Sequence, residues 1–127
     1  MIGGSEAGTM GIEKHEQLRQ RSKRFALRII RLSEALPPRR AADVIARQVL
    51  RSGTAVAANY RAAGRARSRA EFIAKLGVVV EEADETVFWL EMLEESGLVR
   101  ASKLADLRKE AEELLLIFSA SRRTARE

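Results

Sequence analysis

Apolar side chains recur at alternating steps of four and three residues through almost the whole chain, and this spacing leaves few folds open. The repeat runs through four segments, roughly 14–36, 39–64, 69–96 and 102–122. A 4-3 repeat aligns one stripe of side chains along each α-helix and is typical of helices that pack side by side. Because the connections are short, neighbouring helices run antiparallel. The sequence therefore predicts an all-α protein, an up-down-up-down antiparallel four-helix bundle.

Three breaks separate these segments, and each contains residues that end or begin helices. They are Pro37-Pro38, Gly64 to Ser68, and Gly97 to Ser102. Proline lacks a backbone N–H donor and restricts the residue before it, whereas glycine ends helices and serine caps their first turn. Ser68, three residues before Glu71, has the spacing of a capping box.

The length of 127 residues fits a single domain that buries a core without disulfides, and the chain has no cysteine. We expect a flexible arm over residues 1–12, the bundle over 13–122 and a C-terminal tail over 123–127. The N-terminus lacks the pattern of a signal peptide, and no apolar run approaches the ~20 residues of a membrane helix. These features predict a cytoplasmic protein with no membrane partner.

The inward positions of the second segment are unusually small or polar. They include Ser52, Asn59 and Ala63, with Gly53 alongside. The simpler interpretation is that a neighbouring helix approaches closely here. The alternative places Asn59 in a polar site, because a buried amide needs hydrogen-bond partners.

The third and fourth segments carry more apolar surface than one face of a bundle requires. The additional residues are Val78, Val80, Val87, Phe88, Trp89, Leu115, Leu116 and Ile117. A helix that is apolar on every side is usually buried on every side. We therefore expect self-association, with an oligomer interface that includes Glu82, Glu85, Phe88, Trp89, Leu115 and Leu116. The alternative is a monomer with a slightly apolar surface.

Charge is sorted along the chain. Residues 1–69 hold 15 Lys or Arg against 5 Asp or Glu, residues 70–99 hold 1 against 8, and residues 100–127 hold 7 against 5. Basic and acidic stretches that pack side by side neutralise each other, within a chain or between chains. For Glu82 and Glu85 we expect such ion pairs, with Arg47, Arg51 and Arg61 as candidate partners of Glu82. The net charge of +5 leaves positive charge for a polyanion.

Two arginine clusters are the candidate nucleic-acid-binding residues. They are Arg21, Arg24, Arg28 and Arg31 in the first segment, and Arg61, Arg65, Arg67 and Arg69 around the second break. Arginine-rich ridges suit phosphate backbones. No aromatic residues interleave with them, so base stacking is not indicated. The alternative is that these arginines serve solubility and pair with the acidic segment.

The sequence carries no pattern of a catalytic or metal site. A di-iron bundle needs two Glu-x-x-His pairs, and this chain has one histidine, His15. The same shortage excludes the common nucleophilic triads, and no phosphate-binding Gly-x-x-x-x-Gly-Lys loop is present. We expect no enzymatic activity, no cofactor, no metal and no small-molecule substrate.

An ordered set of short motifs resembles a known family. The motifs are Arg51-Ser52-Gly53-Thr54, Ala58-Asn59-Tyr60-Arg61, Ser68-Arg69-Ala70-Glu71-Phe72-Ile73-Ala74-Lys75-Leu76, Glu82, Glu85-Thr86, Trp89-Leu90 and Ser96-Gly97-Leu98. Over about residues 15–122 the chain resembles the bacterial four-helix bundle proteins first recognised as products of intervening sequences in 23S ribosomal RNA genes. The resemblance implies a ring-like homopentamer without known enzymatic activity. The related accessory variability determinant proteins of diversity-generating retroelements are basic pentamers that bind nucleic acid and a reverse transcriptase, which favours RNA binding here.

The sequence thus leads to two hypotheses. The first is a non-catalytic homo-oligomeric bundle, expected to be a pentamer, that binds structured RNA or an RNA–protein assembly through its arginine ridges. The second is a structural or adaptor bundle that binds no nucleic acid and uses its arginines in intersubunit ion pairs.

Overall fold

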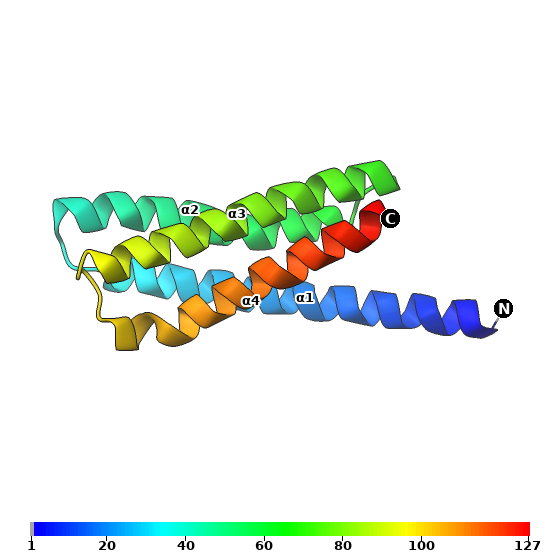
Figure 1. Ribbon diagram of the computed structural model, residues 1–127, viewed down its shortest axis with the longest axis horizontal. Helices are drawn as coiled ribbons and strands as arrows, with labels where there is room; N and C mark the ends of the chain where they lie inside the picture. The colour runs from blue at the N-terminus through cyan, green and yellow to red at the C-terminus, as the bar shows by residue number, and fades with distance from the viewer. Residues whose placement is uncertain (1) are drawn as a thin grey trace.

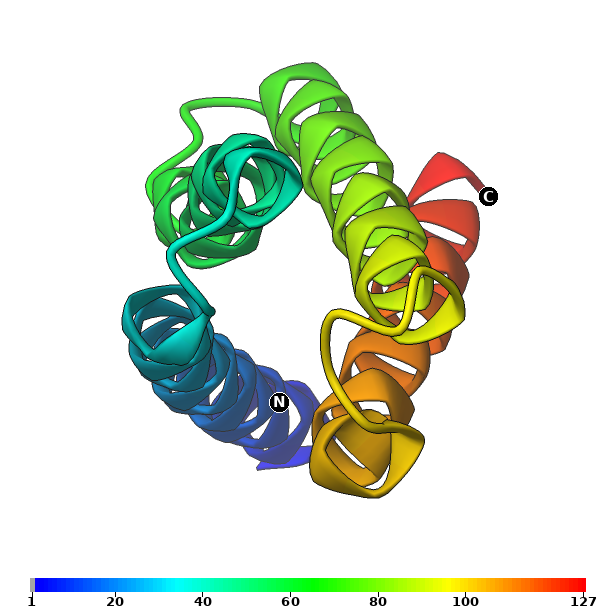
Figure 2. The ribbon, with the colours of Figure 1, turned by 90° about the vertical axis from the view of Figure 1, so that its left-hand side faces the viewer.

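Four helices that alternate in direction make up the chain between residues 2 and 127. The computed structural model describes the backbone of residues 2–127 and the side chains of residues 11–127. The helices are α1 (Ile2–Ala35), α2 (Arg40–Ala63), α3 (Arg69–Glu95) and α4 (Ala101–Arg126). They run up, down, up and down (Figure 1). Seen from one end, each helix lies beside the next one in the sequence (Figure 2). The predicted all-α four-helix bundle is confirmed.

The ends of the helices follow the predicted breaks, except at the start of α1 and at both ends of α4. The Ser68 hydroxyl accepts a hydrogen bond from the Glu71 backbone N–H at 3.0 Å, and Gly97 adopts the left-handed φ of 77° after α3. Helix α4 begins at Ala101, so Ser102 lies inside it rather than capping it. Helix α4 also continues to Arg126, past the boundary predicted at 122.

Helix α1 begins at Ile2, whereas the 4-3 repeat predicted helix only from about residue 14. Its first turns extend beyond the ends of the other helices (Figure 1). The flexibility predicted for residues 1–12 falls mainly on residues whose side chains lie outside the described part of the structure, and it stays a prediction.

The predicted apolar stripes form the core. Side chains from all four helices are almost fully buried, among them Phe25, Ile29, Val56, Leu90 and Phe118. Two buried hydroxyls join α2 and α3 within this core: Thr86 hydrogen-bonds Ser52 at 2.9 Å. Each hydroxyl also reaches a carbonyl of its own helix, so the polar atoms are satisfied where water is excluded.

The small residues of α2 permit a close approach of α1, as the simpler interpretation predicted. A Cβ atom on Gly53 would lie 2.8 Å from Cγ2 of Ile29, which is fully buried in α1. The Asn59 amide donates to the Ala55 carbonyl at 2.9 Å, so its hydrogen bond stays within α2. Nothing in this geometry makes Asn59 the centre of a polar site.

None of the helices in the described chain combines the length and apolar character that a bilayer crossing needs.

Replacing Gly53 with alanine is expected to lower the free energy of unfolding by about 1–3 kcal/mol, because the added methyl group overpacks the contact with Ile29. Helix propensity alone would change stability in the opposite direction by up to about 1 kcal/mol. Urea denaturation followed by circular dichroism measures the difference. Gly11→Ala is the matched control, because a Cβ at this helical position meets no atom within 4 Å. Equal stability of the two variants would contradict a tight α1–α2 contact.

Candidate functional site

The arginine ridge predicted on the first segment is divided between a structural and an exposed part. Arg21 makes a bidentate pair with Glu110, at 2.6 and 2.8 Å, and its Nη2 also lies 2.7 Å from Glu113. These hydrogen bonds raise the pKa of Arg21 further above its ordinary value and tie α1 to α4. Arg21 is therefore committed to a contact within the chain.

The other members of this ridge make no ion pair with any of residues 11–127. Arg24 and Arg31 are exposed and Arg28 is half-buried. Their spacing of four and three residues places them along one side of α1. These three guanidinium groups remain available to a phosphate backbone.

The second predicted cluster lies where α2 ends and α3 begins. Arg61, Arg65 and Arg67 are exposed and form no ion pair within the described side chains. Together with Lys75 they line a groove of about 600 Å³, in which Glu71 is the one acidic residue among the described side chains.

Arg69, the fourth member of this cluster, has a different role. Its Nε donates to the Ala125 carbonyl at 2.7 Å and so satisfies one of the free carbonyl groups at the end of α4. This contact brings the C-terminus of α4 to the same end of the bundle as the connection between α2 and α3 (Figure 1).

Two further arginines, which fall in the predicted C-terminal tail, therefore lie at this end of the bundle. Arg123 and Arg126 are exposed on the last turns of α4 and line a groove of about 530 Å³ with Val80 and Ser119. The signal that could have found them is the basic last turn of α4, a position that cations favour. We call the following set of five exposed arginines the basic end: Arg61, Arg65, Arg67, Arg123 and Arg126.

The acidic residues predicted at an oligomer interface are paired within the chain. Arg51 of α2 lies 3.0 Å from Glu82 and also bonds Glu85, both on α3. The Trp89 indole N–H lies 3.4 Å from the same Glu85 carboxylate. Arg51 is thus the partner among the three candidates, and the pairing joins the basic second helix to the acidic third one as charge sorting predicted.

A similar cluster joins α3 and α4, and it was not expected from the sequence. Arg108 lies 3.0 Å from Glu94 and 3.4 Å from Glu112, with Glu91 at 3.9 Å. Its partners come from two helices, so spacing along one helix could not reveal the whole cluster.

A single bundle buries more of the surplus apolar surface than predicted. Val87 is buried, and Val80, Trp89, Leu115 and Ile117 are partly buried against the core. The exposed remainder is Val78, Phe88 at 47% and Leu116 at 70%. The predicted interface residues therefore include two exposed apolar side chains, Phe88 and Leu116.

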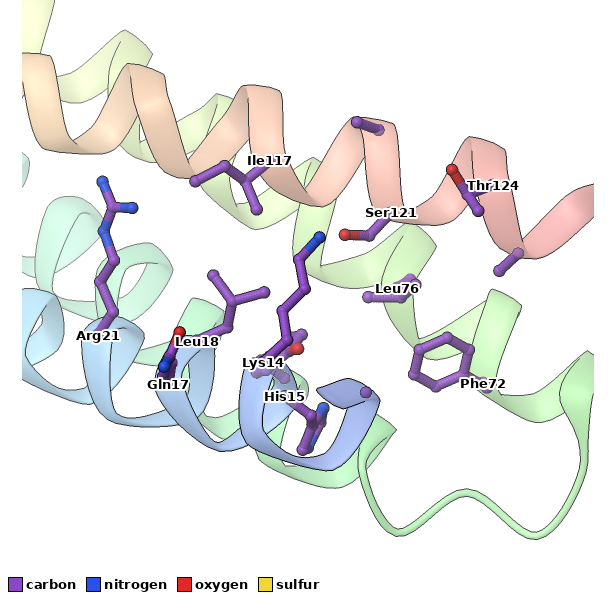
Figure 3. A pocket seen from close by; sticks show the side chains of 14 residues that line it. Lys14, His15, Gln17, Leu18, Arg21, Phe72, Leu76, Ile117, Ser121 and Thr124 are labelled. Atoms are coloured by element: carbon purple, nitrogen blue, oxygen red, sulfur yellow. The ribbon is translucent and has the colours of Figure 1, made fainter. Parts of the chain in front are cut away.

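A cleft of about 750 Å³ opens between α1 and α4, where the neighbouring helices pack least closely (Figure 3). Apolar side chains from three helices line its interior, among them Leu18, Phe72, Leu76 and Ile117. Polar groups stand around them. These are Lys14, His15, Gln17, Arg21, Tyr60, Ser121 and Thr124.

A cluster of three aromatic rings borders the cleft, and two of them, His15 and Tyr60, line it. The Tyr60 ring lies between His15 and Phe118, with ring centroids 4.7 and 4.9 Å away. Gly64 provides the room for His15, because a Cβ at this position would collide with the imidazole. Burial lowers the pKa of His15 and raises the pKa of Tyr60 to about 12, because it disfavours the charged form of each ring. No periodic signal in the sequence marks His15, because it lies far along the chain from its stacking partner.

Among residues 11–127, no group of three or more histidine, aspartate and glutamate side chains is placed to hold a metal ion.

Comparison with known proteins agrees with this architecture. Residues 14–120 match the family model of the 23S rRNA-intervening sequence protein. A crystal structure from Bacteroides thetaiotaomicron, of a protein with unknown function from the S23 ribosomal protein family, is 33% identical and superposes with a TM-score of 0.80. The match covers 87% of this chain and 98% of that one. No curated protein matches the chain. The chain belongs to the 23S rRNA-intervening sequence protein family.

Proposed function

We propose that this protein is a non-catalytic, cytoplasmic homo-oligomer that binds structured RNA through its exposed arginines. The observation that carries the proposal is the basic end. Its five guanidinium groups make no ion pair with any of residues 11–127, although other arginines of the same chain are paired. Arginine binds phosphate groups through two parallel hydrogen bonds, and its positive charge displaces the counterions of a nucleic acid.

The arrangement favours recognition of backbone shape over recognition of bases. Arg61 lies on the last turn of α2 and Arg65 lies just after this helix, and Arg123 and Arg126 lie one turn apart on α4. Arg67 stands in the connection between α2 and α3. The aromatic side chains near this end of the bundle are Tyr60, which is buried, and His15 and Phe72, which are half-buried, so fully exposed aromatic platforms do not accompany the arginines.

Exposed apolar side chains support the oligomeric part of the proposal. Phe88 on α3 and Leu116 on α4 are exposed on the surface of the bundle. Large apolar side chains that gather on a surface mark protein–protein contacts. The resemblance to pentameric bundles makes five the expected number of copies. An adaptor bundle without nucleic-acid binding is the competing function, and the same experiments distinguish the two.

Replacing Arg61, Arg65 and Arg67 with glutamate is expected to weaken binding of a fluorescein-labelled RNA hairpin at least about tenfold, because the attraction to phosphate groups becomes repulsion. The slope of log affinity against log salt should fall by about one for each phosphate that is no longer neutralised. Fluorescence anisotropy at several salt concentrations measures both quantities. The matched comparison is a variant with glutamate in place of Arg24, Arg28 and Arg31. It changes the net charge by the same amount, but the changes lie on α1. RNA affinity that neither variant changes, or no binding at low salt, would favour the adaptor function.

Replacing Leu116 with glutamate is expected to reduce the mass of the assembly, because a charge cannot be buried unpaired in an apolar interface. Phe88→Glu should act in the same direction. Size-exclusion chromatography with light scattering measures the mass, and circular dichroism checks the fold. Ile12→Glu is the control, since Ile12 is similarly exposed at 73% but lies outside the predicted interface. A wild-type protein that runs as single chains would refute self-association.

A further inference from the structure

The cleft between α1 and α4 has the properties of a ligand site, although the sequence predicts no small-molecule substrate. We propose that it binds an amphiphilic organic acid. The apolar body of the ligand lies between the helices, its carboxylate meets Lys14, and Tyr60 donates a hydrogen bond to one of its oxygens. The proposal is independent of RNA binding and goes beyond it.

Shape and lining are the first argument. A volume of about 750 Å³ falls within the usual range for ligand pockets, about 300–1,000 Å³. Leu18 and Leu76 are buried, while Phe72 and Ile117 are half-buried and keep surface toward the cleft. An apolar body that covers these side chains removes them from water, which is favourable in proportion to the area covered.

The hydroxyl of Tyr60 is the second argument. Tyr60 is only 4% exposed, and its hydroxyl makes no hydrogen bond with any of residues 11–127. Buried tyrosine hydroxyls usually have a partner. No described side-chain polar atom is both fully buried and unpartnered, so the small exposed part of Tyr60 includes this hydroxyl, and Tyr60 lines the cleft. The stack with His15 and Phe118 holds the ring in place. Because this hydroxyl is accessible, a ligand bound in the cleft can accept its hydrogen bond in place of water.

The charged side chains that line the cleft favour an anionic ligand. Among residues 11–127, Lys14 and Arg21 line the cleft and no carboxylate does. Arg21 is already held by Glu110 and Glu113. Lys14 is exposed and forms no ion pair within the described side chains, and it rises from α1 toward Ser121 on α4 (Figure 3). One uncompensated ammonium group beside an apolar cleft complements the carboxylate of an amphiphile.

Fluorescence titration with 8-anilinonaphthalene-1-sulfonate, an amphiphilic aryl anion, tests the site, with dodecanoate as the competitor. We expect saturable binding that dodecanoate reverses. Lys14→Gln should weaken the anionic probe about tenfold, the value of a hydrogen bond to a charged group. It should leave the affinity for the neutral probe N-phenyl-1-naphthylamine unchanged. Lys109→Gln is the matched control, because this exposed lysine of α4 does not line the cleft.

A second pair of variants tests the interior of the cleft. Ser121→Trp fills the space and should abolish binding of both probes, and Tyr60→Phe should weaken dodecanoate while the fold is kept. Circular dichroism checks each variant, and Lys14→Gln remains informative if Ser121→Trp does not fold. Probe binding that Ser121→Trp leaves unchanged would overturn the proposal, as would equal effects of Lys14→Gln and Lys109→Gln. If no probe binds and Ser121→Trp changes the mass of the assembly, a second copy of the chain fills the cleft and the proposal is wrong.

Discussion

The close contact between α2 and its two neighbours sets the geometry of the whole bundle. Gly53 lets Ile29 of α1 approach the α2 backbone, and the Ser52–Thr86 hydrogen bond joins α2 to α3 on another side. The looser side is the one between α1 and α4, and it is there that the cleft opens.

Ion pairs between neighbouring helices supplement the apolar packing of the bundle. Arg21 bridges from α1 to two glutamates of α4, Arg51 joins α2 to α3, and Arg108 joins α3 to α4. Partly buried bidentate pairs hold helices at a defined register more than they add stability. Because these three arginines are paired within the chain, fewer positive charges are free for a partner than the number of basic residues indicates. Part of the charge that remains lies at the basic end and along α1.

The fold could be predicted from the sequence because a 4-3 repeat and strong breaks such as Pro37-Pro38 are local signals. The candidate site could be predicted only in part. Arg61 and Arg65 were identified because they cluster around the second break, but the partners of Arg21 lie far along the chain on α4, and no periodicity of one helix reveals them. The stacking of His15 on Tyr60 depends in the same way on how α1 meets α2.

The basic end and the cleft differ in chemistry but share one element, the last turns of α4. Thr124 and Ala125 line the cleft, while Arg123 and Arg126 beside them belong to the basic end. The Arg69 hydrogen bond to Ala125 fixes this turn against the start of α3. Two ligands that bind against one rigid turn can influence each other only through a coupling free energy, which is reciprocal. Any effect of an acid in the cleft on RNA affinity must therefore equal the effect of RNA on the affinity for that acid.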